Sequence, residues 1–151
     1  MKPTTEILAN MSRNSSAHHD EVFTRVYRYL LRPDLYFAAY KRLQANNGAD
    51  TRGVNDDTAD RFSERKINCI IEALKNGSYE PLPVRRTYIR KKNSPAKKRP
   101  LGLPTFTDKL VQDVMRMVLE AIYEPVFSDL SHGFRPNRSC HTALREVKYG
   151  F

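Results

Sequence analysis

The sequence PVRRTYIRKKNSPAKKRPLGLPT, which runs from Pro83 to Thr105, determines how the rest of this chain is interpreted. It contains eight basic residues and no acidic residue: Arg85, Arg86, Arg90, Lys91, Lys92, Lys97, Lys98 and Arg99. The chain of 151 residues has 26 basic residues, 17 acidic residues and a formal net charge of +9, so this stretch accounts for eight of the nine excess charges. Such a concentration of positive charge predicts a polyanionic partner.

The same stretch has the pattern of a β-hairpin. Tyr88 and Ile89 lie in a run of β-branched and aromatic residues, which is typical of a strand. Turn residues follow at Asn93–Pro95, and we expect the returning strand from Arg99 to Leu103, confined to a sheet edge by the prolines beside it. Four apolar side chains are expected to hold the hairpin against a core: Tyr88, Ile89, Leu101 and Leu103. A solvated hairpin without a ligand is the alternative.

Composition predicts a folded domain with a nucleic acid or an anionic membrane surface as its partner. Hydrophobic residues make up 40% of the chain, and eight Tyr and seven Phe residues are available for a core. No apolar run approaches the roughly 20 residues that cross a bilayer, and the N-terminus lacks the apolar core of a secretory signal. Cys69 and Cys140 lie far apart in sequence, which favours a reduced intracellular protein.

Hydrophobic periodicity predicts several helices around the hairpin and therefore an α+β fold. Residues 1–19 are polar and rich in Ser, Thr and Asn, so we expect a flexible N-terminal arm, followed by one domain over residues 20–151. Apolar residues recur at spacings of three and four in five segments. The predicted helices are 20–31, 33–46, 59–76, 105–127 and a short helix from Ser139, and Thr105 with Asp108 matches a capping box.

The loop over residues 48–58 contains a pair of carboxylates, Asp56 and Asp57. Paired carboxylates hold the two magnesium ions of phosphoryl-transfer enzymes, but such sites need a rigid support and usually a third carboxylate. Asp57 or Thr58 is instead positioned to accept hydrogen bonds from the free N–H groups of the helix predicted from Ala59. Helix capping is the interpretation we prefer, so no metal site is predicted here.

A second loop, SHGFRPNRSC, precedes the terminal helix. Arg135 and Arg138 flank its Pro-Asn turn and are placed either to hold a backbone phosphate or to fold back onto an acidic partner. His132, Cys140 and His141 are three possible zinc ligands, but no fourth lies nearby, so the spacing does not favour zinc.

Three segments of the sequence resemble one family of polymerases. They are LYFAAYKRLQANNGADTRGVNDDT (Leu35–Thr58), YEPLPVRRTYIRKKNSPAKKRPLGLPTFTDKLVQDVMRMVLEAIYEPVF (Tyr79–Phe127) and SHGFRPNRSCHTAL (Ser131–Leu144). In this order they resemble the N-terminal extension block and the first two reverse transcriptase blocks of bacterial group II intron-encoded reverse transcriptases, also called maturases. The resemblance implies the mostly helical fingers subdomain, and the start of the palm, of a right-hand polymerase.

The resemblance also implies two sets of binding residues. In similar enzymes two cations contact the triphosphate of the incoming nucleotide, and the matching positions here are Lys91 and Arg99. Fixed cations there stabilise charge that grows on the leaving pyrophosphate. The candidates for contact with template or intron RNA are Arg85, Arg86, Arg135 and Arg138.

The family carries out polymerisation with aspartates that hold two metal ions. The resemblance places those aspartates beyond the second block, so we expect the full-length parent to bind Mg²⁺ through residues outside this chain. Residues 1–151 are then expected to be an inactive N-terminal fragment without a catalytic residue, metal or cofactor of its own. The implied parent is an RNA-directed DNA polymerase of the bacterial cytoplasm that acts in intron splicing and retrotransposition, with RNA, an RNA–DNA duplex and dNTPs as partners.

Two alternatives to a nucleotide-handling role remain. The segment is alternatively an RNA-binding module that docks structured intron RNA for splicing without catalysis of its own. A third interpretation is self-association through a sheet edge or a helix face that is left uncovered.

Overall fold

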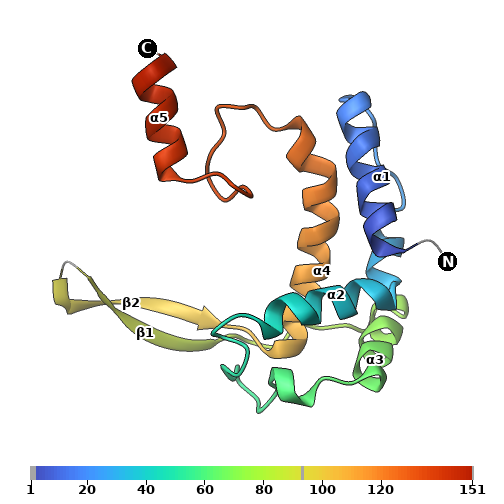
Figure 1. Ribbon diagram of the computed structural model, residues 1–151. Helices are drawn as coiled ribbons and strands as arrows, with labels where there is room; N and C mark the ends of the chain where they lie inside the picture. The colour runs from blue at the N-terminus through green and yellow to red at the C-terminus, as the bar shows by residue number, and fades with distance from the viewer. Residues whose placement is uncertain (1–2, 93, 151) are drawn as a thin grey trace. The chain divides into compact units, whose positions relative to one another are not determined.

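The computed structural model describes residues 3–92 and 94–150, and the predicted turn residue Asn93 lies outside them. The predicted α+β class is confirmed, with helices and one antiparallel hairpin (Figure 1). In chain order the elements are α1 (Thr4–Ala17), the 3-10 helix η1 (Val26–Leu31), α2 (Pro33–Gln44), the 3-10 helix η2 (Ala59–Arg61), α3 (Glu64–Lys75), β1 (Arg85–Lys91), β2 (Ser94–Leu103), α4 (Phe106–Tyr123), the 3-10 helix η3 (Glu124–Val126) and α5 (Cys140–Gly150).

The chain divides into two compact units. The central unit is Thr24–Arg116, and the terminal unit combines Met1–Phe23 with Met117–Phe151. The central unit therefore contains the hairpin and most of α4, while the terminal unit contains α1, the end of α4 and α5. No helix in the described part of the chain is both long and apolar enough to span a bilayer.

The core of the central unit is built from one face each of α2, α3 and α4. Its buried side chains recur at spacings of three and four along each helix, as the sequence pattern predicts. They are Leu35, Tyr36 and Ala39 of α2, Ile67, Ile70, Ile71 and Leu74 of α3, and Phe106, Leu110, Val111 and Val114 of α4. The Tyr36 hydroxyl donates to the Leu30 carbonyl (2.8 Å), which joins η1 to α2, and burial raises the pKa of Tyr36.

The prediction that Thr105 caps the start of α4 is confirmed, although Asp108 bonds to the Thr105 hydroxyl and not to its backbone N–H as in a full capping box. The Thr105 hydroxyl accepts a hydrogen bond from the Asp108 backbone N–H (3.1 Å) and donates one to Asp108 Oδ2 (2.6 Å). The Tyr79 hydroxyl donates to the other carboxylate oxygen of Asp108 (2.6 Å), and burial together with this carboxylate raises the pKa of Tyr79. Thr105 and Asp108 are buried, so this cap is part of the core.

The N-terminal segment, for which composition predicts a flexible arm, is helical in the structure. It forms α1, in which Ile7, Met11 and Ser15 recur every four residues, and Met11 and Ser15 are buried. The Ser15 hydroxyl donates a hydrogen bond to the Ile122 carbonyl of the same unit. Asn and Ser favour helices only weakly, so contacts outside the segment, which composition does not reveal, stabilise this helix.

The α-helix predicted from Asp20 is wrong. Only Val26–Leu31 is helical, as a 3-10 helix, and the preceding Arg25 adopts a left-handed conformation with φ of 57°. Val22, which the predicted stripe includes, is 81% exposed. A spacing of three fits a 3-10 helix as well as an α-helix, and the left-handed residue separates η1 from the chain before it.

Candidate nucleic-acid interface

The basic segment forms the predicted antiparallel hairpin. Its regular part pairs Arg85 with Leu103 at one end and Arg90 with Lys98 at the other. A register shift lies between Arg90 and Lys91, and Lys91 pairs with Ser94. Within the described residues the sheet has these two strands only, and they form a twisted ribbon (Figure 1).

Strand pairing divides the side chains of the ribbon between two faces. Successive residues of a strand point to opposite faces, and directly paired residues share a face. One side, which we call the Arg99 face, carries Arg85, Thr87, Ile89, Arg99, Leu101 and Leu103. The other, which we call the Tyr88 face, carries Arg86, Tyr88, Arg90, Lys98 and Pro100. Arg85 and Arg86, which the sequence places together, therefore lie on opposite faces.

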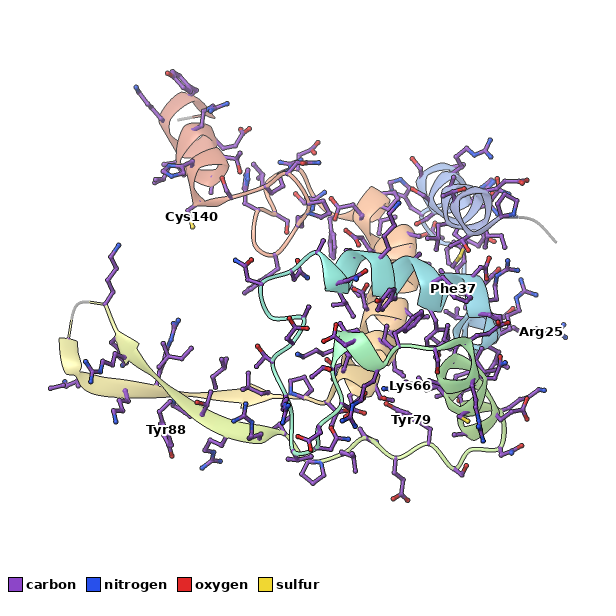
Figure 2. All side chains as sticks on the ribbon, turned by 60° about the horizontal axis from the view of Figure 1, so that its bottom comes forward. Arg25, Phe37, Lys66, Tyr79, Tyr88 and Cys140 are labelled. Carbon is purple, nitrogen blue, oxygen red and sulfur yellow. The ribbon has the colours of Figure 1, made fainter. Side chains whose placement is uncertain are left out.

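The apolar residues of the hairpin do not hold it against a core, so that prediction is wrong. Tyr88 is 59% exposed, Ile89 is 38% exposed and Leu101 is 42% exposed, while Leu103 is half-buried. Figure 2 shows the Tyr88 side chain projecting from the ribbon. The sequence pattern identifies a strand, but it does not contain the information about which element, if any, covers that strand.

The cations of the hairpin are exposed and mostly without partners. The Arg85 guanidinium donates two hydrogen bonds to the Arg52 carbonyl, at 3.1 and 2.8 Å. The other seven form no ion pair with any residue in the ranges 3–92 and 94–150: Arg86, Arg90, Lys91, Lys92, Lys97, Lys98 and Arg99. Their positive charge is therefore available to an anionic ligand. These seven cations include both predicted triphosphate contacts, Lys91 and Arg99.

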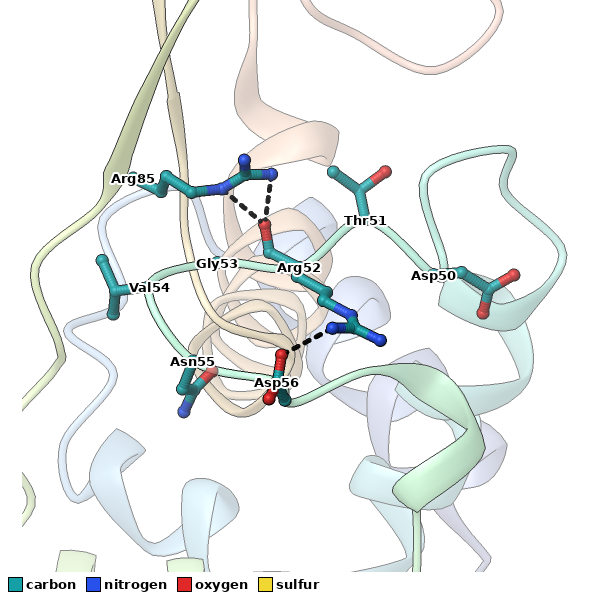
Figure 3. A pocket seen from close by; sticks show the side chains of 8 residues that line it. All are labelled: Asp50, Thr51, Arg52, Gly53, Val54, Asn55, Asp56 and Arg85. Atoms are coloured by element: carbon teal, nitrogen blue, oxygen red, sulfur yellow. Dashed lines mark hydrogen bonds and ion pairs between the residues drawn. The ribbon is translucent and has the colours of Figure 1, made fainter.

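An open pocket of about 470 Å³ lies beside the base of the hairpin, lined by residues 50–56 and Arg85 (Figure 3). The Arg52 guanidinium pairs with Asp56 (2.7 Å) on its exposed rim. Gly53 lies so close to the chain before α4 that a Cβ atom would be 2.8 Å from the Thr105 Cα and N atoms. Only glycine fits this approach without a backbone shift, so the loop has a defined position against the start of α4.

The prediction that Asp57 or Thr58 caps the helix beginning at Ala59 is wrong, because neither side chain caps η2 and Asp57 caps α4 instead. Its Oδ2 accepts hydrogen bonds from the Thr107 backbone N–H (2.8 Å) and hydroxyl (2.7 Å) at the start of α4, and its Oδ1 pairs with Lys66. The next α-helix in sequence, α3, is capped by Ser63, whose hydroxyl accepts a hydrogen bond from the Lys66 backbone N–H (3.2 Å). Burial acts to raise the pKa of Asp57, but the hydrogen bonds from Lys66 and Thr107 outweigh it and leave this pKa below its usual value.

Lys109 fastens the other end of the same loop to α4. Its ammonium group donates to the carbonyls of Gly48 (3.3 Å) and Thr51 (3.2 Å). Burial lowers the pKa of Lys109, and the negative charge of Asp57 partly opposes this effect. Asp56 and Asp57 thus have separate cationic partners, and the described residues contain no cluster of three or more His, Cys, Asp or Glu side chains arranged to bind a metal.

Arg135 folds back onto its own unit, which is one of the two alternatives left open by the sequence. Its Nε donates to Glu124 Oε1 (3.0 Å), and one terminal nitrogen donates to the carbonyls of Ser128 (2.7 Å) and Ser131 (2.9 Å). The guanidinium carbon lies 5.3 Å from the centre of the Phe127 ring, and the side chain is only 8% exposed. These contacts make Arg135 a structural residue, and its contact with RNA stays a prediction.

Arg138 also forms an ion pair, but this pair is more exposed than the pair between Arg135 and Glu124. It donates to the carbonyl (2.7 Å) and to Oδ1 (2.9 Å) of Asp129, whose side chain is 97% exposed. An ion pair at such an exposed position contributes little free energy. Contact between Arg138 and RNA likewise stays a prediction, and it would disrupt fewer existing interactions than the corresponding contact of Arg135.

Comparison with known proteins identifies the relatives of this chain. No family model matches it. Over 151 residues, 100% of this chain, it is 64% identical to group II intron-encoded protein LtrA of Lactococcus lactis subsp. cremoris, of which the match covers 25%. The chain is homologous to the N-terminal quarter of a group II intron-encoded protein. The resemblance predicted from the three sequence segments is thereby confirmed.

Other relatives of this chain are similar over shorter spans. The chain is 43% identical to an uncharacterized 91 kDa protein in the cob intron of Schizosaccharomyces pombe. This match extends over 146 residues and covers 95% of the chain and 18% of the relative. A segment of 48 residues is 46% identical to a part of nuclear intron maturase 1, mitochondrial, of Arabidopsis thaliana. This match covers 32% of the chain and 7% of the relative. The chain thus spans a quarter or less of the length of these relatives.

We expect Asp57→Asn to lower the free energy of unfolding by about 1.5–3 kcal/mol at pH 7, because a neutral amide loses the charged hydrogen bonds from Lys66 and Thr107. The folded-state pKa of Asp57 is lowered, so its contribution is complete above the unfolded-state pKa of about 4 and is lost as the pH falls through the folded-state value. Urea denaturation at pH 7 and at successively lower pH below about 4 should therefore show a shrinking difference from the parent. Asp56→Asn, on the exposed rim, is the matched control and should change stability by less than about 0.5 kcal/mol; equal effects at pH 7 would contradict the capping role.

Arg135→Ala should destabilise the chain by about 2–3 kcal/mol, because it leaves the Glu124 carboxylate and the carbonyls of Glu124, Ser128 and Ser131 without their donor. Arg135→Lys should not restore stability, since an ammonium group lacks the planar fork that reaches all of these acceptors. Thermal unfolding followed by circular dichroism measures both changes. Arg138→Ala serves as the control, with an expected change of less than about 1 kcal/mol, and a larger destabilisation by Arg138→Ala than by Arg135→Ala would refute this division.

Proposed function

We propose that this chain is the N-terminal part of an RNA-directed DNA polymerase that also assists the splicing of a group II intron. The observation that supports this most is an exposed hairpin in a chain homologous to a group II intron-encoded protein. Seven cations of this hairpin form no ion pair with any residue that the structure describes. In the proposal the hairpin belongs to the fingers of a right-hand polymerase. It contacts template or intron RNA and the triphosphate of the incoming nucleotide.

Lys91 and Arg99 are the proposed triphosphate contacts. Both are exposed, and neither has an acidic partner that a triphosphate would have to displace, as far as the described residues show. Two fixed cations would stabilise the negative charge that develops on the leaving pyrophosphate. Mg²⁺ would supply further charge neutralisation, and we assign it to carboxylates of a longer protein, because no cluster within the described residues fits it. The 151 residues alone are then inactive in primer extension.

An RNA-docking module without its own catalysis is the second candidate. Once Lys91 and Arg99 are assigned to the triphosphate, five cations of the hairpin remain that have no acidic partner among the described residues: Arg86, Arg90, Lys92, Lys97 and Lys98. A single nucleotide does not need so many cations, whereas a nucleic acid strand carries a phosphate at each nucleotide. RNA contact is therefore favoured whether or not the segment also handles nucleotides.

Replacing Arg86 or Lys97 by Ala should reduce the salt dependence of RNA binding by the 151-residue chain. Removal of one phosphate contact lowers the slope of log K against log salt by about 0.7 for a single strand and about 0.9 for a duplex. A filter-binding or anisotropy series at several salt concentrations, with an intron RNA and an unrelated structured RNA of equal length, measures this slope. Arg65→Ala is the control of equal charge, because Arg65 of α3 is an exposed cation with no ion pair to another described residue. A slope that falls equally for Arg65→Ala would show that only net charge matters.

Lys91→Ala and Arg99→Ala, made in a longer intron-encoded protein, should lower kcat/KM for dNTP in primer extension by about ten- to a hundredfold, because each removes a cation from the transferring phosphates. RNA affinity should change little. Arg86→Ala in the same protein is the control, and it should weaken RNA binding more than nucleotide use. If all three variants lost RNA affinity equally, Lys91 and Arg99 would have no role separate from that of Arg86. Unchanged primer extension in Lys91→Ala and Arg99→Ala would favour the docking module.

A further inference from the structure

The Tyr88 face of the hairpin has a composition that neither the core nor the internal ion pairs explain. Arg86 and Arg90 lie two residues on either side of Tyr88 on β1, while Pro100 is paired with Tyr88 and Lys98 with Arg90. The Tyr88 ring is 59% exposed and projects from the ribbon (Figure 2). It takes part in no ring contact, cation-π contact or hydrogen bond with another described residue.

Burial in a core does not explain an aromatic ring at this position, because most of the Tyr88 side chain is exposed. A two-stranded hairpin is marginally stable without a further layer, and within the described residues no layer covers this face. Aromatic rings stabilise proteins mainly through the area that they bury, and this ring remains exposed. The face therefore has the surface properties of a site that a ligand covers.

We propose that Tyr88 is a stacking platform for an unpaired nucleobase of RNA, and that Arg86, Arg90 and Lys98 hold the phosphates beside that base. The inference rests on the proposed function, because RNA is the ligand there too, and it adds where single-stranded RNA lies. Exposed aromatic rings between cations bind single strands by stacking on bases of any sequence. Residues two apart on a strand are about 6.6–6.8 Å apart, so long cationic side chains reach phosphates on both sides of the ring.

Duplex RNA is a poorer ligand for this face than a single strand. The bases of a duplex are stacked on each other, so the ring has no base face to cover unless a base is extruded. A membrane surface also fits less well, because interfacial binding depends on buried apolar area. The aliphatic residues of the hairpin, Ile89, Leu101 and Leu103, lie on the Arg99 face instead. The Tyr88 face thus combines charge for a polyanion with one ring for a base.

The two faces of the ribbon then have separate ligands. Arg99 and the paired Ile89 lie on the face assigned to the incoming nucleotide, and Tyr88 lies on the opposite one. A single-stranded segment bound to the Tyr88 face would leave Arg99 accessible. Variants of the two faces should therefore change RNA binding and nucleotide use independently.

The absence of Trp from the chain allows a site-specific test. Tyr88→Trp introduces the only Trp, and Leu101→Trp is the matched control at an exposed position on the opposite face. Both variants are titrated with a short oligouridylate and with an abasic oligomer of the same length and charge. We expect the oligouridylate, but not the abasic oligomer, to quench the fluorescence of Tyr88→Trp, with little change in Leu101→Trp. Equal quenching of both variants would overturn the proposal.

Affinity provides the second readout. Tyr88→Ala should weaken oligouridylate binding by about five- to a hundredfold, since it removes stacking on one base, and Tyr88→Phe should stay within about twofold of the parent. The salt slope should be unchanged in Tyr88→Ala and reduced by about 0.7 in Arg90→Ala. The proposal would be overturned if Tyr88→Ala bound oligouridylate as tightly as the unsubstituted chain does. It would also be overturned if the unsubstituted chain bound the abasic oligomer as tightly as the oligouridylate. Unchanged RNA affinity combined with abolished binding to vesicles of anionic lipid would assign the face to a membrane instead.

These results separate the inference from the function on which it rests. One outcome is that the unsubstituted 151-residue chain binds RNA with a salt slope that depends on Arg86 and Lys97 while Tyr88→Ala binds RNA equally well. In that case the proposal of a stacking site at Tyr88 is wrong and the proposed function stands. If the parent chain binds neither oligouridylate nor intron RNA, both are overturned.

Discussion

The start of α4 is the point on which the central unit depends. A helix leaves its first N–H groups without partners inside the helix, and here Asp57 and Thr105 accept hydrogen bonds from two of them. Carboxylates at this end also interact favourably with the helix dipole. Asp108 in turn accepts a hydrogen bond from Tyr79, so the loop 48–58, the segment after α3 and α4 itself meet at one helix end.

The hairpin is attached at this end and exposed beyond it. Its second strand ends at Leu103, two residues before the capping Thr105, and Gly53 lies against the Thr105 backbone. Arg85, at the base of the first strand, is hydrogen-bonded to the Arg52 carbonyl. A defined base with an uncovered ribbon leaves the cations in water, where charges without partners cost little free energy but attract a polyanion strongly.

Sequence predicts elements whose signals are local. The hairpin, α2 after Pro33, and the Thr105 cap of α4 all follow from turn, proline and capping residues within a few positions. Sequence does not predict α1 or the partner of Asp57, because both depend on contacts with residues about 50 to 107 positions away. It also does not predict the exposure of Tyr88, since a period-two pattern identifies two faces without saying what covers either one.

The same distinction applies to the candidate site. The sequence identifies every cation, but the availability of a cation depends on the partner that a phosphate would replace. Arg135 would give up a set of mostly buried hydrogen bonds, whereas Arg138 would exchange one exposed carboxylate for another anion. Arg99 has no acidic partner to give up among the residues that the structure describes. The net binding free energy is that of the interaction formed minus that of the interaction broken, so the hairpin should contribute more per cation to RNA affinity than the loop that holds Arg135.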